Sequence, residues 1–191
     1  METAQLTSIP AVARELLRLI GEDPSRKELK KTPERFSKAI MELTAGYSMD
    51  IESIVNGAIY PANAMTGLVL IRDIEFHSLC EHHLLPFHGK MHIGYLPNKK
   101  IIGLSKIPRI VQAFSRRLQL QEKLTHQVAS CVNDLLEPEG VAVFTQARHM
   151  CLEMRGAKAK GSAMITTCYL GKFRDCPATR AEFLSLIKSN Q

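Results

Sequence analysis

The sequence predicts an α+β fold in which an antiparallel sheet carries helices on one face. The first observation is the order of the periodic segments, which runs helices, two strands, two helices, two strands and a last helix. Strands that follow one another directly in the chain favour antiparallel pairing, with helices packed against one side of the sheet. The second observation is size, because 191 residues, 45% of them hydrophobic, suit one globular domain or at most two small ones.

Two helices are expected in the N-terminal part of the chain. Ser8 is the expected cap of the first helix, and Gly21 ends it. Thr32 is the expected N-cap of the second helix, which Gly46 stops. Both helices carry apolar residues at helical spacing, so each has one face to bury.

Four strands are expected further along the chain. The first two cover residues 68–76 and 87–96, the second of which alternates between apolar and polar side chains. The other two cover residues 141–147 and 162–170, and residues 151–155 are expected to continue the third strand. A sheet of four strands has two open edges, which predicts pairing with another copy of the chain.

Three more helices are expected, at residues 105–117, at residues 121–136 and near the C-terminus. The last has a capping-box pattern, Thr179-x-x-Glu182, ahead of its apolar residues. These helices supply the apolar faces that the predicted sheet needs to cover its core.

The charge of the chain favours an anionic partner. Lysine and arginine outnumber acidic residues by 25 to 19, for a formal net charge of +6. That excess fits a phosphate compound, a nucleic acid or an acidic surface without choosing among them. No stretch approaches the ~18 apolar residues that span a bilayer, so no membrane association is expected. With no secretory or prenylation signal in view, a cytoplasmic location is predicted.

Cysteine and histidine residues indicate a metal site. The chain has 5 cysteines, and no two stand in a Cys-x-x-Cys pair, so any zinc site needs histidine. Cys80 and His83 have the spacing at which a tight turn aims a thiolate and an imidazole at one ion. The segment His149-Met150-Cys151 offers two candidates for a distant third ligand. With Cys151 the set is Cys2His with one open coordination position, which is typical of catalytic zinc.

The residues between the first two expected strands, 78–86, are expected to lie outside the core, because they are few and polar. His82 and His149 each stand beside a candidate ligand. An imidazole near a metal-activated water is a suitable general acid or base, although either ring could be a structural histidine instead. The zinc deaminase and His-Glu-x-x-His metalloprotease signatures are both absent from the sequence.

Several longer strings resemble the GTP cyclohydrolase I family. The strings are Thr32-Pro33-Glu34-Arg35, Ser78-Leu79-Cys80-Glu81-His82-His83, Pro86-Phe87-His88-Gly89-Lys90, Gly94-Tyr95-Leu96-Pro97, Ile102-Gly103-Leu104-Ser105-Lys106-Ile107-Pro108-Arg109, Gln121-Glu122 and His149-Met150-Cys151-Leu152-Glu153-Met154-Arg155-Gly156. Their order and spacing agree with the family from about residue 30 onward.

This resemblance implies a fold, an activity and an assembly. It implies a zinc enzyme that converts GTP and water to 7,8-dihydroneopterin triphosphate and formate, the first step of folate or tetrahydrobiopterin synthesis. It implies a tunnelling fold (T-fold) catalytic domain over residues 61–191, after an N-terminal helical region over residues 1–60. It also implies a homodecamer of two pentamers with active sites between subunits, without nucleic acid. The sequence leaves a regulatory protein partner and the pathway that uses the product unidentified.

The resemblance also implies a role for each site residue. It makes Cys80, His83 and Cys151 the Zn²⁺ ligands, whose bound water attacks C8 of the purine. It implies that His82 and His149 transfer protons, that Ser105 lies near the ribose, and that Glu122, with Gln121 beside it, binds the guanine edge. It implies that the triphosphate is bound by Lys106, Arg109 and Arg155, and by Arg35 and Lys38 of a neighbouring subunit.

Chemistry independent of the family supports several of these assignments. A carboxylate such as Glu122 accepts both N1–H and the exocyclic amine of guanine, a donor pair that adenine lacks. Lys106 and Arg109 are three residues apart, so they share one face near the positive end of their helix. Arg155 stands four positions after Cys151, so one segment can bring phosphate and metal sites together.

The departures from the family pattern concern residues 157–161 and 163–164, where a strand rich in serine and threonine is expected. They leave the phosphate contacts of that segment open. Cys131, Cys168 and Cys176 match no catalytic role and are interpreted as core or incidental residues.

Two alternative functions are weighed against this interpretation. One is a T-fold relative that acts on another purine or makes another pterin. The other is a nucleic-acid-binding protein with a structural zinc, which predicts a closed site of four ligands and salt-sensitive binding. The second alternative leaves Gln121, Glu122 and the pair of histidines unexplained.

Overall fold

The computed structural model describes residues 8–63 and 67–188. The chain forms two compact units, one ending at Thr44 and one beginning at Ala45. Residues 45–60, which the sequence assigns to the helical region, therefore belong to the second unit. Among the described residues, no helix combines the length and the apolar character needed to cross a membrane.

The N-terminal unit consists of helices α1 (Ile9–Leu19) and α2 (Thr32–Leu43). The expected cap of α1 is confirmed, because the Ser8 hydroxyl accepts a hydrogen bond of 3.4 Å from a main-chain amide of the first turn. The expected cap of α2 is wrong. Lys31 occupies the N-cap position and no side chain caps this helix, so Thr32 is already its first residue.

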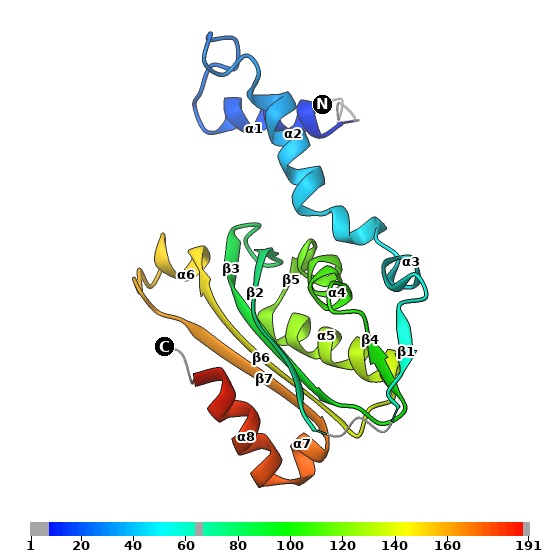
Figure 1. Ribbon diagram of the computed structural model, residues 1–191. Coiled ribbons are helices and arrows are strands. Elements are labelled where there is room, and N and C mark those ends of the chain that lie inside the picture. The colour runs from blue at the N-terminus through cyan, green and yellow to red at the C-terminus, as the bar shows by residue number, and fades with distance from the viewer. Residues whose placement is uncertain (1–7, 64–66, 189–191) are drawn as a thin grey trace. The chain divides into compact units, whose positions relative to one another are not determined.

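The second unit is built on a five-stranded sheet with strand order β5-β2-β3-β6-β7 (Figure 1). The strands are β2 (Val69–Cys80), β3 (Pro86–Leu96), β5 (Leu118–Gln119), β6 (Gly140–His149) and β7 (Met164–Gly171). The four long strands pair antiparallel, which confirms the predicted strands and their direction. The short strand β5 joins β2 in parallel and was not predicted, because two residues are too few to show a period.

The second unit also contains two short helical segments and a small two-stranded sheet. They are η1 (Ala45–Ser48), α3 (Ile51–Val55), β1 (Ile59–Pro61) and β4 (Lys100–Ile102). Strands β1 and β4 pair antiparallel with each other in a separate two-stranded sheet.

Two expectations about the sheet ends are wrong. Strand β2 extends to Cys80, so the residues from Ser78 to Cys80 are buried in the core instead of lying in a polar loop. The cause is β5, which pairs with Leu79 and Cys80 and covers that end of the sheet. After β6, the chain forms the one-turn helix α6 (Met150–Glu153), where the sequence suggested a continued strand.

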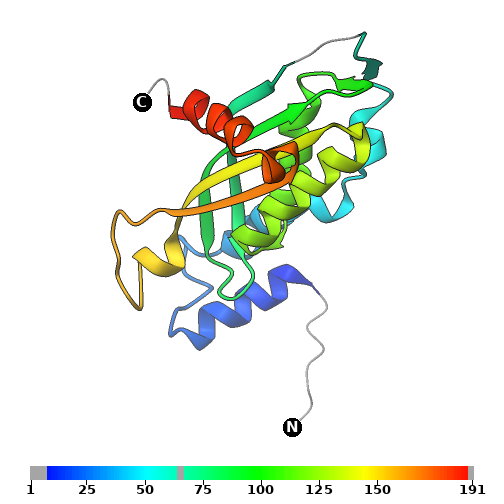
Figure 2. The same ribbon diagram turned by 90° about the horizontal axis from the view of Figure 1, so that it is seen from below.

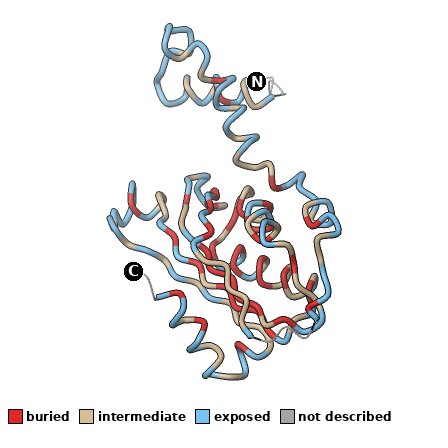
Figure 3. The backbone as a smooth tube through the Cα atoms, viewed as in Figure 1, coloured by how far each residue is buried: buried red, intermediate tan, exposed pale blue. Residues whose placement is uncertain are grey.

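Helices α4 (Lys106–Ser115) and α5 (Gln121–Leu136) cover one face of the sheet. The alternating residues Met91, Ile93 and Tyr95 of β3 point into the apolar cluster that these helices close. Figure 3 shows the buried residues gathered in this layer. Both helices were predicted, and the bounds of α5 agree with the prediction to the residue.

The C-terminal helices α7 (Lys172–Asp175) and α8 (Pro177–Lys188) pack on the opposite face of the sheet (Figure 2). Phe183 of α8 packs so closely there that a Cβ added at Gly94 of β3 would lie 2.8 Å from its ring. Helix α8 begins at Pro177, so the expected start at a Thr179 capping box is wrong.

Candidate metal centre and active site

Three potential metal ligands converge at one end of the sheet. One donor atom from each of Cys80, His83 and Cys151 lies within 4.8 Å of the other two, and Cys80 Sγ is 3.8 Å from His83 Nδ1. Cys80 ends β2, His83 lies in the turn after it, and Cys151 lies on α6. The structure therefore brings together the three residues that the family resemblance implies as ligands.

A tight turn places His83 beside Cys80. The main-chain carbonyl of Cys80 accepts hydrogen bonds from the amides of His83 at 3.3 Å and Leu84 at 2.9 Å. Leu84 has a φ of +55°, a left-handed conformation that reverses the chain toward β3. The Cys80 amide then donates to the carbonyl of Leu85 at 2.8 Å, which closes the turn.

Strand register brings Cys151 to the same place from 71 positions along the chain. Strand β2 pairs Leu79 with Pro86, and β3 pairs Phe87 with His149. Strand β3 therefore lies between β2 and β6, and the last residues of β2 and β6 lie at the same end of the sheet. The helical turn of α6, which follows His149 directly, carries Cys151 to the Cys80–His83 turn.

The donor set fits a zinc ion. Zinc bonds of about 2.3 Å to sulfur and about 2.0 Å to nitrogen place tetrahedral ligands about 3.6 Å apart, close to the observed Cys80–His83 separation. Burial and the neighbouring Cys80 thiol raise the pKa of the Cys151 thiol. Two thiols crowded in this way become thiolates together only beside a cation. Within the described residues the group has three protein donors, which leaves a fourth tetrahedral position for water or substrate.

His149 is held rigidly beside this group. Its ring stacks on the buried Phe87 ring with centroids 4.6 Å apart and an interplanar angle of 4°. Its Nε2 lies 2.8 Å from the side-chain oxygen of Gln121. Burial lowers the pKa of the His149 imidazole, and the negative charge of Glu122 opposes that shift. A lowered pKa favours the neutral form of the imidazole, which can accept a proton.

His82 lies next to His83 in the turn and is exposed, with the two rings edge to face at 6.2 Å between centroids. The two histidines differ accordingly, because His149 is half-buried against Phe87 and Gln121 whereas His82 is exposed.

The start of α5 lies against the Cys80–His83 turn. The Glu81 amide donates to the Gln119 carbonyl at 3.1 Å, and the Glu81 carboxylate pairs with Lys123 at 3.7 Å. Glu122 lies between these contacts in sequence, is exposed, and acts electrostatically on His149. Its carboxylate is therefore placed to meet a ligand that occupies the metal centre.

Of the residues implied for the triphosphate, Arg155 lies at the metal end of the sheet. Arg155 is exposed just after α6, and its charge acts on the Cys151 thiol. The neighbouring Arg148 pairs with Glu153 at 2.8 Å, which ties the last residue of α6 back to β6. Sequence reasoning did not single out this ion pair, because nothing in local spacing links a strand residue to the turn after it.

Ser105 and Lys106 stand at the start of α4, and none of Ser105, Lys106 and Arg109 belongs to the Cys80–His83–Cys151 group. Ser105 shares a hollow with residues 71–75 at the beginning of β2. The nearest of these, Glu75, is five residues before Cys80, which is about 17 Å along a strand. The Lys106 ammonium donates to the main-chain carbonyl of Ile54 at 2.9 Å, so it is partly engaged within its own chain.

Arg35 and Lys38 belong to the N-terminal unit, where both are exposed on α2. They line a hollow with Lys30, Lys31 and Glu34, a cluster with an excess of positive charge.

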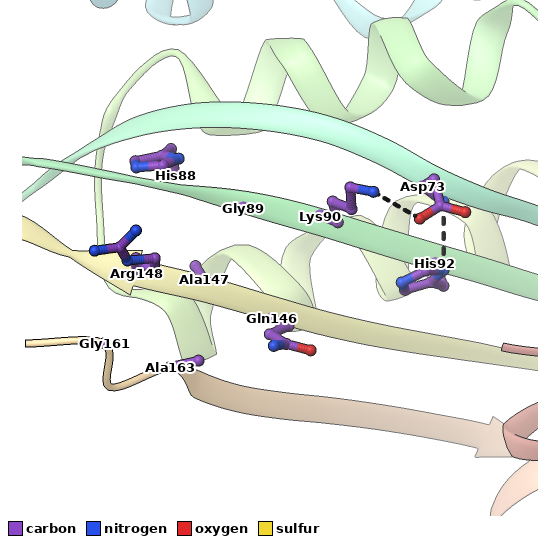
Figure 4. Close-up of a pocket in the computed structure, with 10 residues that line it drawn as sticks. All are labelled: Asp73, His88, Gly89, Lys90, His92, Gln146, Ala147, Arg148, Gly161 and Ala163. Carbon is purple, nitrogen blue, oxygen red and sulfur yellow. Dashed lines mark hydrogen bonds and ion pairs between the residues drawn. The ribbon is translucent and has the colours of Figure 1, made fainter. Parts of the chain in front are cut away.

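A third hollow, of about 430 Å³, lies on the sheet face that bears polar residues (Figure 4). His88, Lys90 and His92 of β3 line it, as their alternation with apolar residues predicts. Lys90 pairs with Asp73 at 3.1 Å, and the Asp73 amide donates to Nδ1 of His92 at 3.3 Å. Lys90 and Asp73 therefore form an ion pair with each other, and neither they nor His88 and His92 belong to the metal centre.

The fold and this centre define the class of protein: an α+β protein with a Cys2His group that can hold a metal and a histidine beside it in the chain. A sequence profile described as GTP cyclohydrolase I matches residues 9–188, and the chain belongs to the GTP cyclohydrolase I family. It is therefore a hydrolase of pterin biosynthesis, and the α+β tunnelling fold expected from the sequence is confirmed.

Relatives of this chain carry the same description. A GTP cyclohydrolase 1 of Leptospira biflexa is 55% identical over 92% of this chain and 95% of its own length. One of Pseudomonas syringae pv. tomato, named GTP cyclohydrolase 1 2, is 50% identical over 91% of this chain and 95% of its own. One of Neurospora crassa is 49% identical over 98% of this chain but only 59% of its own length.

Proposed function

We propose that this protein opens the imidazole ring of GTP with water, releases formate and forms 7,8-dihydroneopterin triphosphate. The observation that carries the proposal is the convergence of Cys80, His83 and Cys151 at 4.8 Å or less, with His149 and Glu122 beside them. Membership in the family and the names of its relatives support the same reaction.

We propose Zn²⁺ as the metal, held by Cys80, His83 and Cys151. The two sulfurs and one imidazole nitrogen favour zinc over harder cations such as magnesium, which prefer oxygen ligands. When bound there, zinc would activate a water molecule for attack at neutral pH.

Glu122 is proposed to bind the Watson–Crick edge of guanine. A carboxylate accepts two hydrogen bonds from N1–H and the exocyclic amine, and this places the base over the metal centre. Adenine offers no matching donor pair, so its binding would leave Glu122 unpaired. Mismatches of this kind discriminate by about 10⁴ or more.

His149 and His82 are proposed to move protons at the purine nitrogens that flank C8. Ring opening turns a ring nitrogen into a leaving group, which must gain a proton as its bond to C8 breaks. His149 is neutral and fixed, so it suits proton acceptance. His82 is exposed, so it suits delivery of a proton to a nitrogen of a bound ligand.

The remaining substrate contacts are proposed to come from other copies of the chain. The ribose is bonded to N9, directly beside C8, so a residue that contacts it must lie near the metal. Ser105 shares a hollow with residues 71–75 of β2, the nearest of which is about 17 Å along the strand from Cys80, and this favours a site shared between subunits. Arg109, Arg35 and Lys38 are proposed to complete the triphosphate site from neighbours in a decamer of two pentamers. A cytoplasmic location, where GTP is made and used, stays a prediction.

The test is direct. The purified protein, loaded with zinc, is incubated separately with GTP, ATP and GDP, and formate release is measured together with a fluorescent pterin after oxidation. The proposal expects that formate and the pterin form from GTP, and that ATP and GDP give none or far less of either product. Formate from ATP at a comparable rate would favour a relative that acts on another purine, and no formate from any nucleotide would overturn the proposal.

A further inference from the structure

The side chain of Gln121, the first residue of α5, is fully engaged inside the protein. It is 1% exposed. Its amide nitrogen donates to the carbonyl of Thr145 at 3.2 Å, the carbonyl of Met164 at 3.1 Å and the hydroxyl of Thr166 at 3.1 Å. Its oxygen lies 2.8 Å from Nε2 of His149. Every polar atom of the side chain therefore has a partner before any substrate arrives.

The orientation of this amide is fixed by the chemistry of its neighbours. Carbonyl oxygens only accept hydrogen bonds, so the group facing Thr145 and Met164 must be the amide nitrogen. Turning the amide over would set its oxygen against two carbonyl oxygens with no hydrogen between them, which is costly. The Gln121 oxygen must consequently face His149.

An oxygen at this position accepts a hydrogen bond from the His149 ring. The ring nitrogen that faces it, Nε2, must then carry the proton, because two acceptors would otherwise meet at 2.8 Å. In the neutral imidazole the lone pair is left on Nδ1. The Phe87 ring, parallel at 4.6 Å, holds the plane of the imidazole, and the hydrogen bond to Gln121 selects which ring nitrogen faces the amide oxygen.

We infer that Gln121 is a positioning residue: its amide oxygen holds His149 in the tautomer protonated at Nε2, which leaves Nδ1 as the proton-accepting atom. The inference rests on the proposed function, in which His149 moves protons during ring opening. It gives Gln121 a role different from a contact with the guanine edge, and it leaves Glu122 to bind that edge alone.

The tautomer can be observed without any change at position 121. Protein as isolated with its metal is labelled with heavy-nitrogen histidine, and a long-range nitrogen–proton correlation spectrum is recorded at about pH 8, where most imidazoles are neutral. His149→Asn identifies the signals of this ring by their loss. The inference expects the pattern of an Nε2–H imidazole, and an Nδ1–H pattern or a mixture of both tautomers would overturn it.

A kinetic comparison separates positioning from substrate binding. Gln121→Met keeps the length of the side chain but offers no acceptor to His149. We expect its kcat for formate release to fall about 100-fold, the scale of a lost general base, with KM for GTP changing less than about threefold. A raised KM with an unchanged kcat would mean that Gln121 binds guanine, and would overturn the inference.

Thr166→Val is the matched control, because it removes one partner of the same buried amide and leaves the Gln121 oxygen at His149. Its kcat is expected to stay within about threefold of the original. Equal losses of kcat in Gln121→Met and Thr166→Val would mean that the effect comes from disrupting the buried hydrogen bonds of Gln121 and not from a change of tautomer, and would contradict the inference. Absence of formate from the unaltered protein would instead contradict the proposed function, and the spectrum would still report the tautomer.

Discussion

Replacing Cys151 by serine tests the proposed metal centre, because Cys151 is the ligand that comes from a distant part of the chain. The hydroxyl of serine is a poor substitute for a thiolate as a zinc ligand at neutral pH. Four-ligand structural zinc sites bind with about 10–16 kcal/mol, or about 2.5–4 kcal/mol for each ligand. Loss of one of the three donors found here is therefore expected to cost about 3 kcal/mol, which is about 100-fold in zinc affinity.

The measurement is a competition between the protein and a coloured zinc chelator, with formate release from GTP assayed on the same samples. Cys168→Ser is the matched control, since Cys168 is also a partly buried cysteine but lies on β7 and outside the metal group. Zinc affinity and activity should fall together in Cys151→Ser and stay near the original in the control. A Cys151→Ser protein that binds zinc within about threefold of the original would refute the ligand assignment.

Three further predictions concern proton transfer, guanine binding and the second face of the sheet. His82→Ala should retain zinc and lose about 100-fold in kcat; an unchanged kcat would remove His82 from the mechanism. Glu122→Gln should weaken GTP binding about 100-fold, because it weakens two hydrogen bonds to a charged acceptor. The midpoint of unfolding in urea should stay unchanged. Unaltered GTP binding would mean that guanine is bound elsewhere. Phe183→Ala removes a fully buried ring and should lower the free energy of unfolding by about 3–5 kcal/mol. Leu186→Ala, on the same helix and 40% exposed, is its control and should change unfolding by about 0.5 kcal/mol; equal losses would contradict the packing described.

The sequence by itself determined features that depend on short-range patterns. The bounds of α5 and the alternation along β3 follow from periods of 3.6 and 2 residues, which neighbouring side chains set without help from the rest of the fold. The pairing of Cys80 with His83 follows from a four-residue spacing that a tight turn can close. The unusual strings of the catalytic region also sufficed to indicate the family, because several of them agree at once.

Other features of the fold were not predicted from the sequence because they depend on strand pairing, ion pairs or the path of the chain, which the local residue pattern does not show. Cys80 looks like a loop residue, yet β5 buries it by pairing with the last residues of β2. Residues after β6 have the composition of a strand but form α6, held by the Arg148–Glu153 ion pair. Thr179 has the pattern of a cap, but the chain already turns into α8 at Pro177.

The arrangement of residues in the candidate site became visible in the tertiary structure alone. Strand register alone brings Cys151 to Cys80, since the two are 71 positions apart and no local interaction joins them. Gln121 and Glu122 are adjacent in sequence, but one is buried against His149 and the other is exposed. Their difference arises because successive residues of a helix point in directions about 100° apart, so only the packing of α5 against the sheet selects which of them faces the core.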